Sequence, residues 1–236
     1  MQEFLRFFGH GFCHQIPARS FEAGGLVFSA CSRDTGIYLG FFCGLVVAFL
    51  IYSRRQTKPA ELPPLPCLIV LALFIAPMAI DGATSYLGMR PTTNAIRYFT
   101  GFLTGSAAAC VIVPLLFALR KDAAPEENAF AKPPVLALQM LLALALGTAF
   151  FFGYPLLGAV APFVAVAAFL TVIISVNLVV LTLFKRFEPL HTARHWLILL
   201  ALSSALALGE IFLLGAFREV LVQFLLEGHE LYEFLS

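Results

Sequence analysis

The sequence predicts an all-α integral membrane protein, a bundle of about six transmembrane helices with a short interfacial helix at each end. Three observations support this prediction: hydrophobic residues make up 60% of the chain, charged residues only 12%, and the mean hydropathy is +0.90. Soluble domains carry about 25% charged residues, so a water-soluble fold is excluded. The formal net charge is +1 and no basic stretch is interleaved with aromatic residues, so no nucleic-acid partner is expected.

Six apolar stretches are long enough, or nearly so, to cross a hydrocarbon core of about 30 Å, which needs roughly 20 residues of helix. A run of prolines before the second stretch marks a loop and a helix start, and Gly153-Tyr154-Pro155 marks a tight turn between the fourth and fifth. We therefore expect residues 1–236 to form a single polytopic membrane domain. The expected spans are 35–52, 66–81, 96–119, 134–153, 158–184 and 196–217.

The segments outside these spans are short. Residues 1–12 read as an interfacial helix anchored by aromatic side chains, within a motif-bearing segment, 1–34. Residues 219–236 alternate apolar and acidic positions and predict a second surface helix. The longest polar loop, about 120–133, is interpreted as a linker, so no soluble domain is expected.

Basic residues gather in three loops that share one side of a six-span bundle. Short loops rich in Lys and Arg stay in the cytoplasm, so the sequence predicts a multi-pass protein of the cell membrane with both termini outside. The segment 1–34 and a second polar motif near residues 81–97 then lie on the external face. The basic residues that set this orientation are Arg54, Arg55, Lys58, Arg120, Lys121, Lys132, Lys185, Arg186 and Arg194.

The first motif places four potential metal ligands in two close pairs, Cys13-His14 and Cys31-x-x-Asp34. Thiolate, imidazole and carboxylate together suit one zinc or similar divalent metal ion, and three ligands leave an open position as catalytic zinc requires. Two other interpretations stay open. Cys13 and Cys31 could form a disulfide on an oxidising side of the membrane, and His14 could be bonded locally.

The second motif runs from Asp81 to Arg97, between the second and third spans. Pro91 suits the first turn of a helix, with Thr92 or Thr93 near its cap. Arginines and an amide that face one way near a helix N-terminus make an anion cradle. Alternatively the arginines bind lipid headgroups or pair with Asp81. The cradle would be built from Arg90, Asn94 and Arg97, with Arg19, Ser20 and Arg33 of the first motif as further substrate-binding residues.

Glycines recur every four residues in the first and third spans. Small residues at this spacing let helices approach closely, so we expect these two spans to be packed neighbours. That contact would bring the two polar motifs together. The glycines are Gly36, Gly40 and Gly44 in one span and Gly101 and Gly105 in the other.

Both motifs resemble those of a family of bacterial and archaeal membrane proteins, domain-of-unknown-function family 2085. The resemblance rests on Cys13-His14-Gln15, on Cys31-Ser32-Arg33-Asp34, and on Asp81-Gly82 with Arg90, Asn94 and Arg97, and it covers roughly the first 110 residues. The family pattern has a cysteine where this chain has Asp34. Without a second thiol at this spacing, a redox Cys-x-x-Cys role is disfavoured. Metal ligation stays open, because aspartate is also a metal ligand. The resemblance implies a membrane protein and no particular activity.

The leading functional hypothesis is a membrane-embedded, metal-dependent enzyme that acts on a lipid or lipid-linked phosphate at the outer face. Metal held by the first motif would activate water or polarise the phosphoryl group. Arg90 and Arg97 would hold anionic oxygens, and Asp81 would serve as general base or a further ligand. Membrane lipids and a lipid-phosphate substrate are thus the expected partners.

Two other classes of function are kept. A carrier for a metal ion or small anion would use Asp81 and Glu210 as membrane-embedded ionisable groups. Glu210 lies within the sixth span, where a carboxylate could be a proton relay, an arginine partner or a neutral acid. A non-catalytic assembly or structural protein would use the cysteines and histidine only to brace the N-terminal segment.

Overall fold

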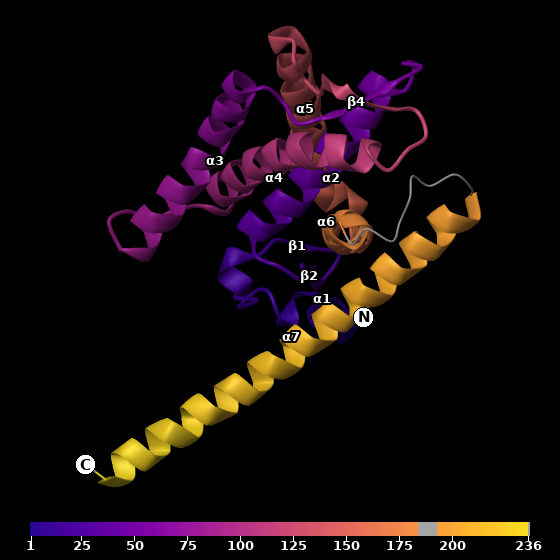
Figure 1. Cartoon of the computed structure of the whole chain (residues 1–236). Helices are drawn as coiled ribbons and strands as arrows, with labels where there is room; N and C mark the ends of the chain where they lie inside the picture. Colours follow the sequence, from indigo (N-terminus) through magenta and orange to yellow (C-terminus); the bar gives the residue numbers. More distant parts are fainter. Residues whose placement is uncertain (184–192, 236) are drawn as a thin grey trace.

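The computed structural model describes residues 1–183 and 193–235, and its main feature is a bundle of long helices (Figure 1). Six helices of the described part are long and apolar enough to cross a membrane. Each overlaps one of the expected spans, so the all-α membrane bundle is confirmed. These helices are α2 (Ser32–Tyr52), α3 (Leu65–Tyr86), α4 (Asn94–Phe117), α5 (Pro133–Leu157), α6 (Val160–Leu183) and α7 (Ala193–Leu235).

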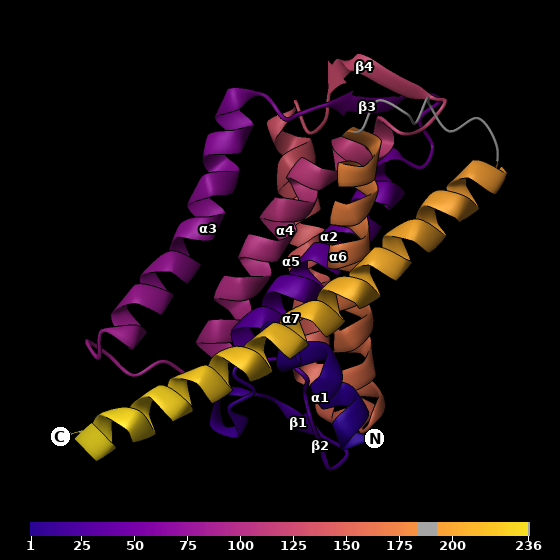
Figure 2. The same cartoon turned by 60° about the horizontal axis from the view of Figure 1, so that its bottom comes forward.

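Smaller elements close the two ends of the bundle (Figure 2). At one end, called here the sheet end, β3 (Lys58–Glu61) pairs in parallel with β4 (Ala123–Asn128). The expected linker 120–133 is therefore partly a strand. At the other end, called here the motif end, lie α1 (Gln2–His10), a 3-10 turn (Pro17–Arg19) and the hairpin of β1 (Glu22–Ala23) and β2 (Leu26–Val27).

The contact between α2 and α4 forms the centre of the bundle, as the glycine spacing predicts. A Cβ atom added at Gly40 would lie 2.1 Å from the carbonyl oxygen of Phe102, and one at Gly105 would lie 1.9 Å from that of Ile37. Only glycine permits these backbones to lie so close. The Ser106 hydroxyl adds a hydrogen bond of 3.1 Å to the Gly40 carbonyl across the same contact. The first turns of α2 and α4 are thus held side by side at the motif end.

Helix α7 differs from the expectation. Residues 219–236 were predicted as a separate surface helix, whereas α7 continues without a break from Ala193 to Leu235, a length of 43 residues. The boundary near Arg218 has no proline to end the helix, and both Arg and Glu favour helix. The helix lies obliquely across the bundle, so that its middle part passes α1 at the motif end and its C-terminal end extends beyond it (Figure 2).

The assignment of the motif end to the external face stays a prediction. Two of the basic residues used for it, Lys185 and Arg186, and the last residue of the fifth expected span lie outside the described residues. The structure does bring the first and second motifs to the same end of the bundle, because α2, α3 and α4 cross it in alternating directions (Figure 2).

Candidate metal and anion site

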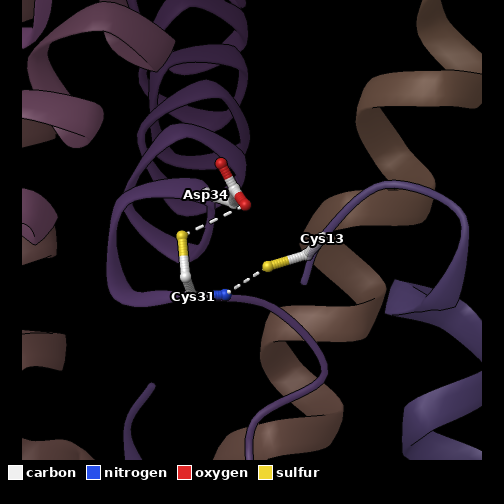
Figure 3. A group of neighbouring side chains, drawn as sticks. All are labelled: Cys13, Cys31 and Asp34. Carbon is white, nitrogen blue, oxygen red and sulfur yellow. Dashed lines mark hydrogen bonds between the residues drawn. The ribbon is translucent and has the colours of Figure 1, made fainter. Parts of the chain in front are cut away.

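Three of the four expected metal ligands come together at the motif end. One ligand atom from each of Cys13, Cys31 and Asp34 lies within 4.8 Å of the other two (Figure 3). Cys31 is the N-cap residue of α2, Asp34 lies in the first turn of that helix, and Cys13 belongs to the loop after α1. The sharp turn at Gln15, whose φ is 52°, directs the chain away from the cluster immediately after Cys13.

Hydrogen bonds at this cluster favour a negatively charged sulfur on Cys13. Its Sγ accepts the backbone N–H groups of Cys31 at 3.2 Å and of Gln15 at 3.5 Å. The hydrogen bond between the two cysteine side chains lowers the pKa of Cys13 and raises the pKa of Cys31. Asp34 Oδ2, 3.2 Å from Cys31 Sγ, is an alternative acceptor for the single proton of that thiol. Because the thiolate is the form that ligates metal, Cys13 is prepared for that role.

The donor set fits zinc. Zn–S bonds of about 2.3 Å place tetrahedral sulfur ligands about 3.8 Å apart, so atoms within 4.8 Å need to move by only about 1 Å to share one ion. Three protein ligands leave the fourth position open. Cys13 and Cys31 are not joined by a disulfide in the structure, and their pairing under oxidising conditions stays an alternative prediction.

His14 is not part of this ligand group. Its side chain is exposed and instead lines a cavity between α1 and α7. Adjacent residues on a sharply turning backbone point in different directions, so Cys13 and His14 cannot both face the cluster. Gln15, which sequence reasoning did not assign, fixes this turn: its Nε2 donates to the carbonyls of Arg6 at 2.8 Å and Ser29 at 2.9 Å.

The second motif is organised around Asp81, whose side chain is only 1% exposed near the C-terminal end of α3. Arg33 Nη2 lies 2.5 Å from one carboxylate oxygen, and Arg90 Nη2 lies 2.7 Å from the other. The Thr92 hydroxyl donates to the second oxygen at 2.7 Å. Two arginines from two different motifs thus share one buried carboxylate, which confirms the predicted juxtaposition of the motifs.

The local structure of this segment differs in detail from the expectation. Helix α4 begins at Asn94, with Thr93 as its N-cap accepting the Ile96 N–H at 3.2 Å. Pro91 therefore precedes the helix and does not lie in its first turn. Arg90 also lies outside the helix and faces Asp81 through its own loop. Because Pro91 separates Arg90 from α4, the three cradle residues do not share one helical face.

Arg19 and Arg97 have no carboxylate partner among residues 1–183 and 193–225. Arg97 Nη1 donates to Asn94 Oδ1 at 3.1 Å, and Arg19 stacks over the Tyr86 ring at 5.8 Å. The charge of Arg97 interacts unfavourably with the charges of Arg19 and Arg33 and favourably with that of Asp81. Both arginines are half-buried. The motif end thus holds positive charge that its own acids do not fully neutralise.

The other predicted substrate-binding residues stabilise the loop that carries Arg19. The Ser20 hydroxyl donates to the Ile16 carbonyl at 3.1 Å, and Asn94 Nδ2 lies 3.4 Å from the Ala18 carbonyl. Ser32, which sequence reasoning did not assign, donates to the Arg19 carbonyl at 3.0 Å. Its position directly after the α2 cap was the only signal for this role.

Glu210 lies apart from both motifs. Asn177 Nδ2, on α6, donates to Glu210 Oε2 at 3.3 Å and lies 3.4 Å from the Ser203 carbonyl. The carboxylate therefore has an amide partner, and no ion pair to an arginine is found in the described part of the chain. This contact joins α6 to α7 within the bundle.

The fold and the site define a multi-pass helical membrane protein with a thiol–carboxylate cluster and an arginine-rich end. The chain belongs to the family described as predicted membrane protein (DUF2085), whose model matches residues 13–111. That segment contains the whole ligand group together with Arg19, Arg33, Arg90 and Arg97. The family description names no activity.

Two archaeal relatives match the same region. An uncharacterized protein of Methanocaldococcus jannaschii is 34% identical over 105 residues, which cover 44% of this chain and 64% of that protein. An uncharacterized protein of Methanothermobacter thermautotrophicus is 40% identical over 97 residues, covering 41% of this chain and 80% of that protein. The chain thus matches less than two thirds of the length of the first relative. No solved structure matches the chain.

Proposed function

We propose that the protein is a membrane-embedded, metal-dependent enzyme that hydrolyses or transfers a lipid or lipid-linked phosphate at the outer membrane face. One observation supports this most strongly: the Cys13, Cys31 and Asp34 ligand group lies at the same end of the bundle as two half-buried arginines that have no carboxylate partner among the described residues. A metal ion polarises a phosphoryl group and guanidinium groups bind its anionic oxygens, so the two together suit phosphoryl chemistry.

The proposal gives each residue a separate task. Zinc bound to the ligand group supplies polarisation of a phosphoryl oxygen or a water of lowered pKa. Arg97 and Arg19 bind the anionic oxygens, since a guanidinium group binds phosphate in a bidentate manner. The hydrogen bond of 3.0 Å from Ser32, the residue after Cys31, to the Arg19 carbonyl supports the view that the two parts can act on one substrate group.

Asp81 takes a different role from the one expected of a general base. Both of its oxygens are engaged, by Arg33 and by Arg90 with Thr92. A carboxylate whose two oxygens already accept hydrogen bonds is a poor proton acceptor, but it holds the side chains that donate to it in fixed positions. We therefore assign Asp81 as a positioning residue that aligns Arg33 and Arg90, with Arg90, like Arg97, close enough to the substrate to contribute positive charge.

The carrier hypothesis has one supporting observation, the pairing of Glu210 with Asn177 between α6 and α7. Carriers do place ionisable groups of this kind within the membrane. Its other proposed acid, Asp81, is tied to arginines at the end of the bundle, and no described interaction joins the two acids. Flux across vesicles that is abolished by Glu210→Gln would favour the carrier over the enzyme.

The enzyme proposal is tested by phosphate release from purified protein in mixed micelles. Diacylglycerol phosphate and a polyprenyl diphosphate serve as substrates, with zinc added or removed by a chelator. We expect zinc-dependent release that falls by about 10²-fold or more in Arg97→Gln, as when one transition-state donor is lost. The matched control is Arg55→Gln at the sheet end, which should retain full activity. Zinc-loaded protein that releases no phosphate from either substrate would contradict the proposal.

A further inference from the structure

The cavity between α1 and α7 that His14 lines lies outside the metal and arginine groups described above. Its volume is about 680 Å³, within the usual range for small-molecule sites. It shares no side chain with the ligand group or with the arginines around Asp81. The walls include Arg6, His10, His14, Phe212, Arg218 and Glu219.

The walls of this cavity are fixed by contacts between the two helices. His10 Nε2 lies 2.7 Å from Glu219 Oε1. Arg218 Nη1 donates to the carbonyl of His10 and, at 2.8 Å, to that of Cys13, where its charge also complements the C-terminal end of α1. A Cβ atom added at Gly11 would lie 2.8 Å from Leu214 Cβ, so the end of α1 meets α7 closely. The cavity is therefore present without a ligand.

The residues around the cavity are of the kinds expected at the boundary between lipid tails and headgroups. Helix α1 exposes Phe4 and Phe7 while burying Leu5 and Phe8 against the bundle, as an interfacial helix does. Along α7 the wall changes from Ile211 and Phe212 to Arg218 and Glu219 within two helical turns. An amphiphile can therefore place its chain against the apolar part and its head against the charged part.

The charges of the cavity include both signs. Arg6 Nη1 and Glu3 Oε1 lie 3.9 Å apart on its rim, and Glu219 faces it from α7. A head with only negative charge would meet two carboxylates, and one with only positive charge would meet two arginines. A phosphate with an ammonium group two carbons away satisfies both, because Arg6 can bind the phosphate and Glu3 or Glu219 the ammonium.

We propose that this cavity binds the phosphoethanolamine headgroup of a zwitterionic phospholipid, with an acyl chain along Phe212. The site does not depend on the enzymatic proposal, because binding there involves none of the residues assigned to metal or phosphoryl chemistry. It also connects to the metal group through Arg218, which holds the backbone of Cys13. A lipid bound in the cavity would stabilise the loop after α1 that carries Cys13.

Binding to delipidated protein in detergent provides the test. The probes are short-chain phosphatidylethanolamine, short-chain phosphatidylglycerol, glycerophosphoethanolamine without chains, and inorganic phosphate. We expect saturable binding of phosphatidylethanolamine, measured as a rise in Tm with concentration, and affinity at least about tenfold lower for phosphatidylglycerol. Glycerophosphoethanolamine binding as tightly as the lipid would assign the same headgroup chemistry to a free solute.

Two variants locate the site. Arg6→Gln and Glu3→Gln change side chains that do not hold α1 to α7, so the protein should keep its Tm without lipid. Each should lower the affinity for phosphatidylethanolamine by about tenfold, whereas Arg54→Gln, an exposed change at the sheet end, should leave it unchanged. Equal affinity for both lipids, binding of inorganic phosphate alone, or unaltered affinity in Arg6→Gln and Glu3→Gln would overturn the proposal.

Discussion

The two ends of the bundle use basic residues differently. At the sheet end, buried Lys58 donates to the carbonyls of Tyr52 and Arg55, at 2.7 and 2.5 Å, and closes the end of α2. Arg120 makes two hydrogen bonds to Asp122, at 2.8 and 3.0 Å. At the motif end, half-buried Arg97 has no carboxylate partner in the described part of the chain and is close to other arginines.

The difference indicates where ligand chemistry is to be sought. A partly buried charge costs free energy unless a partner compensates for it. The sheet end compensates its less exposed basic residues internally, so their role is structural. At the motif end, Asp81 balances the charges of Arg33 and Arg90. Arg19 and Arg97 have no such partner in the described part of the chain, so they are the residues expected to bind an external anion. Substitutions at one end, compared with substitutions at the other, test this difference.

The largest effect is expected for Asp81→Asn. Removing the charge leaves Arg33 and Arg90 buried or half-buried without a counter-ion, which should lower the free energy of unfolding by about 3–5 kcal/mol. The matched change at the sheet end, Asp122→Asn, removes a partly exposed pair and should cost up to about 1 kcal/mol. Denaturant unfolding in detergent micelles measures both. Equal losses at the two ends would show that the Asp81 cluster is not the stronger anchor.

The second prediction concerns Lys58→Met. The side chain is nearly isosteric, but the carbonyls at the end of α2 lose their donor, so we expect a loss of about 1–3 kcal/mol of stability. Metal content and anion binding at the other end should not change. Lys121→Met, at an exposed position nearby, serves as the control and should alter stability by less than about 0.5 kcal/mol. Loss of metal in the Lys58 variant would contradict the division of tasks.

The smallest effect on stability is expected for Arg97→Gln. Relief of its repulsion with Arg19 and Arg33 offsets the weakened contact to Asn94, so the free energy of unfolding should change by less than about 0.5 kcal/mol. Affinity for a lipid phosphate should nevertheless fall by about tenfold, as for the loss of one charge-assisted contact. Titration with diacylglycerol phosphate measures that affinity. A large stability loss with unchanged affinity would instead make Arg97 a structural residue.

Much of the fold could be predicted because its signals are local. Long apolar runs indicate helices that cross the membrane, and glycines at four-residue spacing indicated the contact of α2 with α4. The parallel pairing of β3 with β4 could not be predicted, since strands of a few residues have no detectable periodicity and their partners are distant in sequence. The continuity of α7 past Arg218 was missed because an amphipathic pattern does not distinguish a new helix from a continued one.

The sequence predicted which residues belong to the candidate site better than it predicted how their side chains are arranged. Ligand type and spacing indicated Cys13, Cys31 and Asp34, but the direction of His14 depends on the positive φ at Gln15, which no local pattern announces. Pairing of Arg33 and Arg90 with Asp81 depends on how α2, α3 and the loop before α4 meet. The role of Thr92 depends on the same arrangement, because its hydroxyl contacts a carboxylate eleven positions earlier in the chain.

The most direct test of the metal site is the amount of zinc bound per chain in protein purified in detergent without chelators. The comparison is with the double variant Cys13→Ser/Cys31→Ser, and Cys43→Ser, a buried cysteine of α2 outside the ligand group, is the control. We predict close to one zinc ion per chain in the natural protein and in the control, and none in the double variant. Natural protein without metal, with Cys13 and Cys31 oxidised to a disulfide, would contradict the account.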